Sequence, residues 1–84
     1  MKAQDLSSGD FVEHYLAPHT IWEVRNVERY TSDGGQASLK WVGGAKITYA
    51  LRQRICDVYV GGDVAHINNL RPANPMLVIA LVSR

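Results

Sequence analysis

The chain has 84 residues, and its nine Lys and Arg stand against eight Asp and Glu, for a net charge of +1. This length predicts one domain with a small core, and the near balance of charge excludes the general basic excess that is typical of nucleic-acid binders. The single cysteine, Cys56, excludes an internal disulfide and a cysteine-rich zinc site. We therefore expect no cofactor, and stability that comes from the core or from association with other chains.

The first expected elements are a polar arm and two strands. Residues 1–8 lack the apolar centre of a signal peptide, and we expect them to form a flexible N-terminal arm. "GDFVEHYLA" then predicts a strand, and "IWEVRNVERY" predicts a second one. In the second strand Trp22 and Val24 share a face, but the phase slips before Val27. The slip predicts a β-bulge near Arg25 and Asn26.

Alternation continues along the middle of the chain. In "ASLKWV" the apolar residues Leu39 and Trp41 share one face. "KITYALR" alternates in the same way and is expected to be the next strand, although residues 49–58, "YALRQRICDV", are the best helical candidate and a short helix there is the alternative. "ICDVYV" predicts a further strand. Ile67 and Leu70 then have the spacing of a 3₁₀ turn.

Three Gly-Gly pairs separate these runs, in "SDGGQ", "WVGGAK" and "YVGGDV". Glycine supplies the backbone conformations that tight turns between strands need. Short strands punctuated by such turns predict an all-β fold, either a small barrel or a sandwich. "GGAKIT" lacks the spacing of a phosphate-binding loop, so we expect a hairpin turn there.

Several segments carry a family resemblance. The chain has a Gly-Asp-apolar-Val start, a Trp-x-Val strand and a Leu-Arg-Pro-Ala segment after the expected 3₁₀ turn. In this layout it resembles the small SH3-like barrels of bacterial and phage proteins. The resemblance implies a barrel of five to six short strands over residues 9–73. The matching positions are Gly9, Asp10, Phe11, Val12, Trp22, Val24, Leu70, Arg71, Pro72 and Ala73.

The most apolar run, "MLVIALV", follows this expected barrel. Pro72 and Pro75 interrupt a continuous strand, so we expect residues 76–82 to form an extra C-terminal strand. A strand with one wet face should alternate, and this one does not. It would therefore be covered by a second copy of the chain or by a larger protein assembly; the alternative is a central strand of its own domain. The expected partner-binding residues are Met76, Leu77, Val78, Ile79, Ala80, Leu81 and Val82.

Residues that could carry chemistry form no familiar motif. His14, His19 and His66 lack a local metal-ligand spacing, and no nucleophile motif surrounds Cys56. We expect no enzyme and no metal site, with Cys56 as a small buried hydrophobe. Both tryptophans fall on the apolar phase of their strands and are expected in the core.

These observations predict a non-enzymatic protein-interaction or assembly module, either cytoplasmic or incorporated into a virion, without membrane contact. The resemblance implies a capsid- or tail-associated phage or prophage protein. One alternative is a nucleic-acid-binding barrel, in which Lys40, Lys46 and Arg52 share an outer face beside aromatic residues that stack on bases. A second alternative is a small inhibitor of a host factor, which would have the same sequence features.

Overall fold

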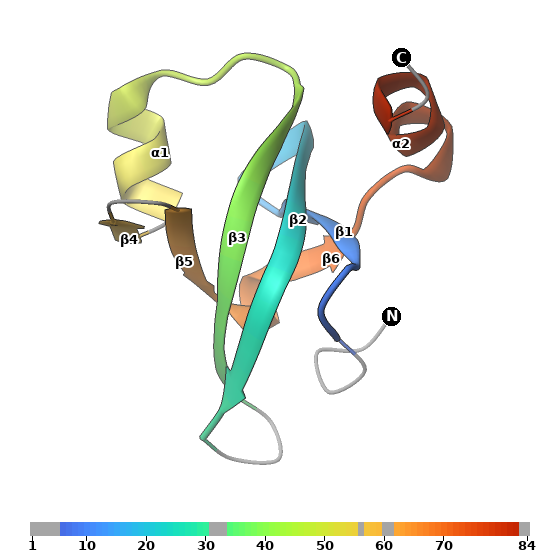
Figure 1. Ribbon diagram of the computed structural model, residues 1–84. Helices are drawn as coiled ribbons and strands as arrows, with labels where there is room; N and C mark the ends of the chain where they lie inside the picture. Colours follow the sequence, from blue (N-terminus) through green and yellow to red (C-terminus); the bar gives the residue numbers. More distant parts are fainter. Residues whose placement is uncertain (1–5, 31–33, 56, 60–61, 83–84) are drawn as a thin grey trace.

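The computed structural model describes residues 6–30, 34–55, 57–59 and 62–82. Within these ranges the chain forms a six-stranded antiparallel sheet and two short helices (Figure 1). The strands lie in the order β4-β5-β3-β2-β1-β6. The all-β expectation is confirmed in its coarse form, because the fold is built on one sheet. The sheet is not closed into a barrel, since β4 and β6 remain its two edges.

A long β2–β3 hairpin forms the centre of the molecule, and α1 and α2 lie on opposite sides of it (Figure 1). A 3₁₀ turn, η2, precedes the last strand. The elements are β1 (Phe11–His14), β2 (Ala17–Arg29), β3 (Gly35–Gly44), α1 (Tyr49–Ile55), β4 (Asp57–Tyr59), β5 (Gly62–His66), η2 (Ile67–Asn69), β6 (Leu70–Pro72) and α2 (Pro75–Val82).

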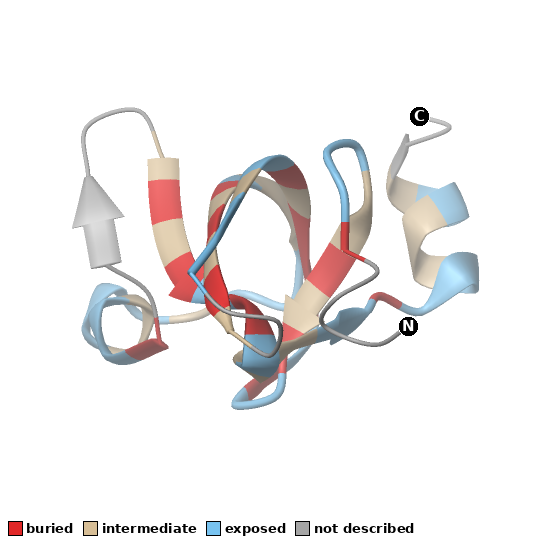
Figure 2. Cartoon of the chain, turned by 90° about the horizontal axis from the view of Figure 1, so that it is seen from below, coloured by how far each residue is buried: buried red, intermediate tan, exposed pale blue. Residues whose placement is uncertain are grey.

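The core lies against one face of this sheet. Buried and partly buried residues alternate from Gly35 to Leu39 on β3 and along most of β5 (Figure 2), as the period of two in a strand requires. Trp22 is fully buried, and its register partner Trp41 packs edge-on against it, with ring centroids 4.9 Å apart. The buried apolar cluster comprises Leu6, Val12, Ala17, Trp22, Val24, Ala37, Leu39, Ile55, Ala65 and Ile67.

Two local expectations are confirmed. The β2–β3 register shifts between Val24 and Asn26, at the place of the expected β-bulge. Ile67 begins η2 and is buried, and the side chain of His66 accepts a hydrogen bond from the Asn68 amide at the start of the turn. β6 then pairs antiparallel with β1, so the 3₁₀ turn directs the chain back to the first strand.

The expected strand over "KITYALR" is wrong throughout: residues 46–48 lie in the connection after β3, and α1 begins at Tyr49. The helical alternative is confirmed for residues 49–55. Thr48 precedes α1, and its Oγ1 accepts a hydrogen bond from the Leu51 amide, 3.1 Å away. This is the geometry of an N-cap, which satisfies an amide that has no partner within the helix. The helix packs beside β4 and buries Ile55. An N-cap and tertiary packing therefore outweigh the β-favouring alternation of this segment.

The expected extra C-terminal strand is also wrong, because residues 75–82 form α2. Asn74 accepts the Met76 amide on its Oδ1, 2.9 Å away, and the Val78 amide on its carbonyl, 3.0 Å away. Pro75 occupies the first helical position, where a missing amide proton costs nothing. Asn-Pro was the sequence signal for this helix, and a run of apolar residues by itself does not distinguish a helix from a strand.

The Gly-Gly pair in "WVGGAK" ends β3, but it leads into α1 and not into a hairpin. Gly44 has a φ of +100°, which L side chains rarely adopt. A Cβ at this position would also collide with the backbone carbonyl of His19. Glycine is therefore needed at this position for both conformation and space.

Residues 6–8, which we placed in the N-terminal arm, contact the sheet. Leu6 is buried, and its carbonyl accepts a hydrogen bond from the Arg29 guanidinium, 2.7 Å away. The Ser8 hydroxyl donates to the Arg25 carbonyl. Residues 1–5 and Cys56, for which we expected an arm and a buried thiol, lie outside the described residues.

Candidate functional site

The helix α2 is the most apolar element of the chain and one of the least covered. None of its described side chains, over residues 75–81, is buried, and α2 stands apart from the buried parts of the sheet in Figure 2. Met76 is 76% exposed and Ile79 is 61% exposed. Helices of soluble proteins normally turn a polar face to water, and α2 carries no polar side chain from Pro75 to Val82.

One side of α2 rests on the end of β3. Leu77, Val78 and Leu81 are half-buried, whereas Met76, Ile79 and Ala80 are exposed. Gly43 lies against the helix, because a Cβ there would be in ordinary van der Waals contact with Leu81 Cδ1, at 3.5 Å. The exposed residues are spaced i, i+3 and i+4 and therefore share the opposite side of the helix. We call Met76, Ile79 and Ala80 the outer face of α2.

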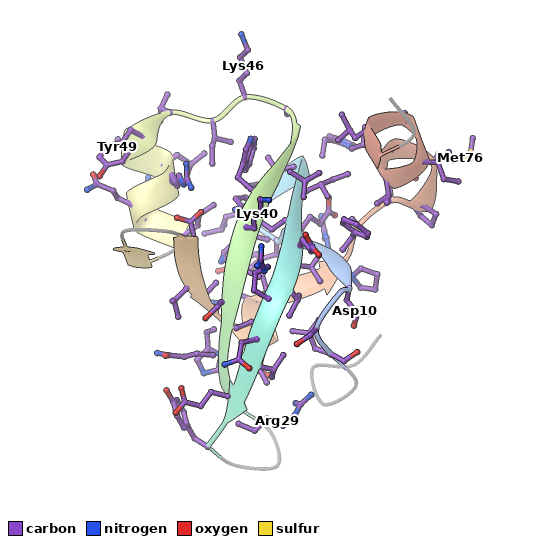
Figure 3. The ribbon with its side chains drawn as sticks, viewed as in Figure 1. Asp10, Arg29, Lys40, Lys46, Tyr49 and Met76 are labelled. Atoms are coloured by element: carbon purple, nitrogen blue, oxygen red, sulfur yellow. The ribbon has the colours of Figure 1, made fainter. Side chains whose placement is uncertain are left out.

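The three basic residues of the expected nucleic-acid face do not share a face. Lys40 is exposed on β3, between the inward-facing Leu39 and Trp41, so it points to the other side of the sheet. Its register partner on β2 is Glu23. Lys46 lies in the β3–α1 connection and Arg52 lies on α1. Figure 3 shows Lys40 over the middle of the sheet and Lys46 extending from its far end.

Lys46 and Arg52, without Lys40, line a pocket between β3 and α1. Its volume is about 320 Å³, which is at the lower end of the range of small-molecule sites. Trp41, half-buried and not fully in the core as expected, forms part of the wall. The pocket is lined by Trp41, Lys46, Ile47, Tyr49 and Arg52. Sequence alternation did not identify this set, because four of its five members come after the end of β3, in a loop and in α1.

A buried carboxylate holds α1 against the sheet behind this pocket. Asp63 on β5 has a fully buried side chain, and Arg52 Nη2 lies 2.7 Å from its Oδ2. Arg52 Nε donates to both carboxylate oxygens, and the Trp22 indole N–H donates to Oδ2 at 3.2 Å. These contacts compensate for the loss of hydration of the carboxylate. Nothing in the local sequence around Asp63 indicates this structural role.

The three histidines have different environments. His14 is buried on β1, whereas His19 and His66 are exposed. Among the described residues, no three His, Cys, Asp or Glu side chains are grouped so that they could hold a metal ion. His14 Nδ1 accepts the Leu16 amide at 3.1 Å, and its ring stacks on Tyr15. The imidazole therefore shapes the β1–β2 turn.

His14 should make the fold sensitive to acid. Burial lowers the pKa of His14 below its ordinary value of 6.5. The unfolded chain therefore binds the proton more readily than the folded chain does. The contribution of the neutral His14 to stability is complete above pH 6.5 and is lost as the pH falls through the folded-state pKa. We expect the free energy of unfolding to decrease by up to about 1.4 kcal/mol per pH unit in this window. Urea denaturation as a function of pH measures this dependence.

The matched variants are His14→Asn and His19→Asn. Asparagine can still accept the Leu16 amide, in an Asx turn, but it does not titrate. His14→Asn should flatten the decrease in stability below pH 6.5, and His19→Asn should leave it unchanged because His19 is exposed. An equal slope in wild type and His14→Asn would refute the assignment.

Comparison with protein-family models, with curated proteins and with solved structures found no match to this chain. Neither helix in the described part of the chain is long and apolar enough to cross a membrane.

Proposed function

We propose that this chain is a non-enzymatic protein-interaction module that associates with a second copy of itself through the outer face of α2. The observation that carries the proposal is the exposure of an entirely apolar helix, in which no described side chain is buried. Burying a large apolar side chain that is exposed to water contributes about 1.5–3 kcal/mol of transfer free energy. Covering Met76 and Ile79 therefore provides a driving force for association.

A second copy is the partner that this surface suits best. The outer face of α2 has no charge and no hydrogen-bonding side chain, so it is complementary to another uncharged surface. A two-fold axis beside α2 would bring two identical apolar faces together, and such isologous dimers are the commonest oligomers. Ala80 is small and allows close approach of the two helices. Association would also supplement the small core of an 84-residue chain.

The barrel resemblance and the phage assignment also remain proposals. The 3₁₀ turn before β6, together with the pairing of β6 with β1, supports the resemblance to SH3-like barrels. An assembly role is compatible with a capsid- or tail-associated phage protein and with a protein inhibitor, and both stay predictions. The outer face of α2 replaces the intermolecular strand as the proposed contact.

The proposal predicts concentration-dependent dimerisation. The outer face of α2 is small beside the roughly 800 Å² that each partner buries in a standard interface, so we expect a dissociation constant between about 1 µM and 1 mM. Sedimentation equilibrium over this range should show monomer and dimer. Ile79→Glu should abolish the dimer, because two carboxylates would face each other without a counter-charge.

Leu16→Glu is the matched control, since Leu16 is 49% exposed in the β1–β2 turn and receives the same change of side chain. It should dimerise like wild type, and circular dichroism should show both variants folded. A wild-type chain that stays monomeric at about 1 mM, or dimers that survive in Ile79→Glu, would show that a second copy does not cover α2.

A further inference from the structure

We propose that the pocket between β3 and α1 binds a nucleotide, with the phosphate on Lys46 and the base against the aromatic wall. This inference goes beyond the proposed dimerisation and is independent of it, because α1 and α2 lie on opposite sides of the β2–β3 hairpin (Figure 1). It rests on which charges, rings and volume the fold brings together at this one place.

The charge of the pocket favours an anionic ligand. Of its two cations, Arg52 is neutralised by Asp63, which contacts Arg52 Nε and Nη2. The ammonium of Lys46 makes no ion pair or hydrogen bond with any residue that the structure describes, and its side chain points away from the fold in Figure 3. The pocket thus has one uncompensated positive charge on a flexible stem, which can close over a bound ligand.

A phosphate suits this charge better than a carboxylate does. The fork of Arg52, which can bind either group with two hydrogen bonds, already holds Asp63. Lys46 remains as a point charge, and a phosphate monoester carries about −1.5 to −2 at neutral pH, more than the single charge of a carboxylate. Lys46 therefore attracts the phosphate more strongly.

The wall of the pocket suits a flat ring. Trp41 is half-exposed and is fixed by its edge-on contact with the buried Trp22, so its indole is held in place before a ligand arrives. Tyr49 is exposed on the first turn of α1, and Ile47 adds an apolar side chain. Stacking of a base on an aromatic side chain contributes about 1–3 kcal/mol. The volume of about 320 Å³ suits one nucleotide and not an extended chain.

Nuclear magnetic resonance of the ¹⁵N-labelled chain can test this directly, because Trp22 and Trp41 give separate indole N–H signals. The spectrum of Trp22→Phe, which lacks one of them, assigns the two signals. Titration with adenosine monophosphate should shift the Trp41 signal saturably, with a dissociation constant of about 1 mM or below. Adenosine lacks the phosphate and inorganic phosphate lacks the nucleoside, so each should bind at least about tenfold more weakly than adenosine monophosphate.

Lys46→Gln and Lys40→Gln are matched variants, since both remove one exposed lysine charge. Lys46→Gln should weaken binding of adenosine monophosphate about five- to tenfold, towards the affinity of adenosine, and Lys40→Gln should leave it unchanged. The absence of a saturable Trp41 shift, equal binding of inorganic phosphate, or equal losses in the two variants would overturn the proposal.

A short single-stranded oligonucleotide distinguishes the two sources of such a ligand. Binding at least about tenfold tighter than that of the mononucleotide, with a steep salt dependence, would assign the site to the end of a nucleic acid. Equal affinity would assign it to a free nucleotide. Either result supports a nucleotide as the ligand. If Lys46→Gln bound the mononucleotide and the oligonucleotide as tightly as wild type, the proposal would be contradicted for both sources.

Discussion

Replacing Arg52 with alanine is expected to lower the free energy of unfolding by about 3 kcal/mol. Removing one partner of a buried ion pair typically costs about 3–5 kcal/mol, because the other charge stays buried without compensation. Asp63 has a fully buried side chain, but Arg52 is 32% exposed, so water can partly replace the guanidinium. We therefore expect a value at the lower end, measured by urea denaturation at neutral pH.

Arg54→Ala is the matched control for this prediction. Arg54 lies on the same helix and is exposed, and exposed charges contribute about 0–1 kcal/mol. Arg52→Lys should fall between the two variants, because an ammonium keeps the charge but cannot contact both oxygens of Asp63 as the guanidinium does. If Arg52→Ala and Arg54→Ala destabilised the fold equally, the pair would not hold α1 to the sheet.

Truncating Trp22 to alanine should have the largest effect of all, a loss of about 3–5 kcal/mol. The side chain is fully buried, packs against Trp41 and donates its indole N–H to Asp63. An 84-residue domain is expected to have a total stability of about 4–13 kcal/mol. The loss is therefore comparable with the whole stability, and thermal denaturation followed by circular dichroism should show a partly or fully unfolded chain.

Two milder variants keep this prediction measurable if Trp22→Ala does not fold. Trp22→Phe keeps a ring but removes the donor to Asp63, so it should cost about 1–3 kcal/mol. Trp41→Ala truncates the half-exposed neighbour and should cost clearly less than Trp22→Ala. A Trp41→Ala loss that equals the Trp22→Ala loss would contradict the placement of Trp22 at the centre of the core.

Both stability predictions depend on one connection between three elements. Trp22 lies on β2, Arg52 on α1 and Asp63 on β5, and the pairs are 41 and 11 residues apart in sequence. If these contacts act as a network, the losses in Arg52→Ala and Trp22→Phe will not add in the double variant. The pocket wall would also move with the network, because Arg52 and Trp41 line it.

Periodicity predicted the strands well wherever one face of the strand is buried. Leu39 and Trp41 face the core, the bulge lies after Val24, and η2 begins at Ile67. Each of these features depends on residues that are close in sequence. A local pattern reports them because the sheet imposes a period of two on each strand separately.

The same reasoning failed for the two helices. Residues 49–55 and 75–82 contain apolar residues that are compatible with a strand, and their caps, Thr48 and Asn74, are single residues. Short helices depend on caps and on what they pack against, since a single turn is unfavourable by itself. We therefore expected the apolar residues of α2 to be a contact surface, but we expected them in a strand and not in a helix.

Amino-acid order by itself determined the small β-rich fold, the positions of the bulge and the 3₁₀ turn, and the absence of polar cover on residues 76–82. Only the tertiary structure decided which side of α2 lies on β3 and which stays exposed, that Asp63 joins Trp22 to Arg52, and that Lys46 shares a pocket with Trp41 while Lys40 does not. The physical reason is distance along the chain. Local patterns specify which face of an element is apolar, whereas contacts between distant residues depend on how all the elements pack together.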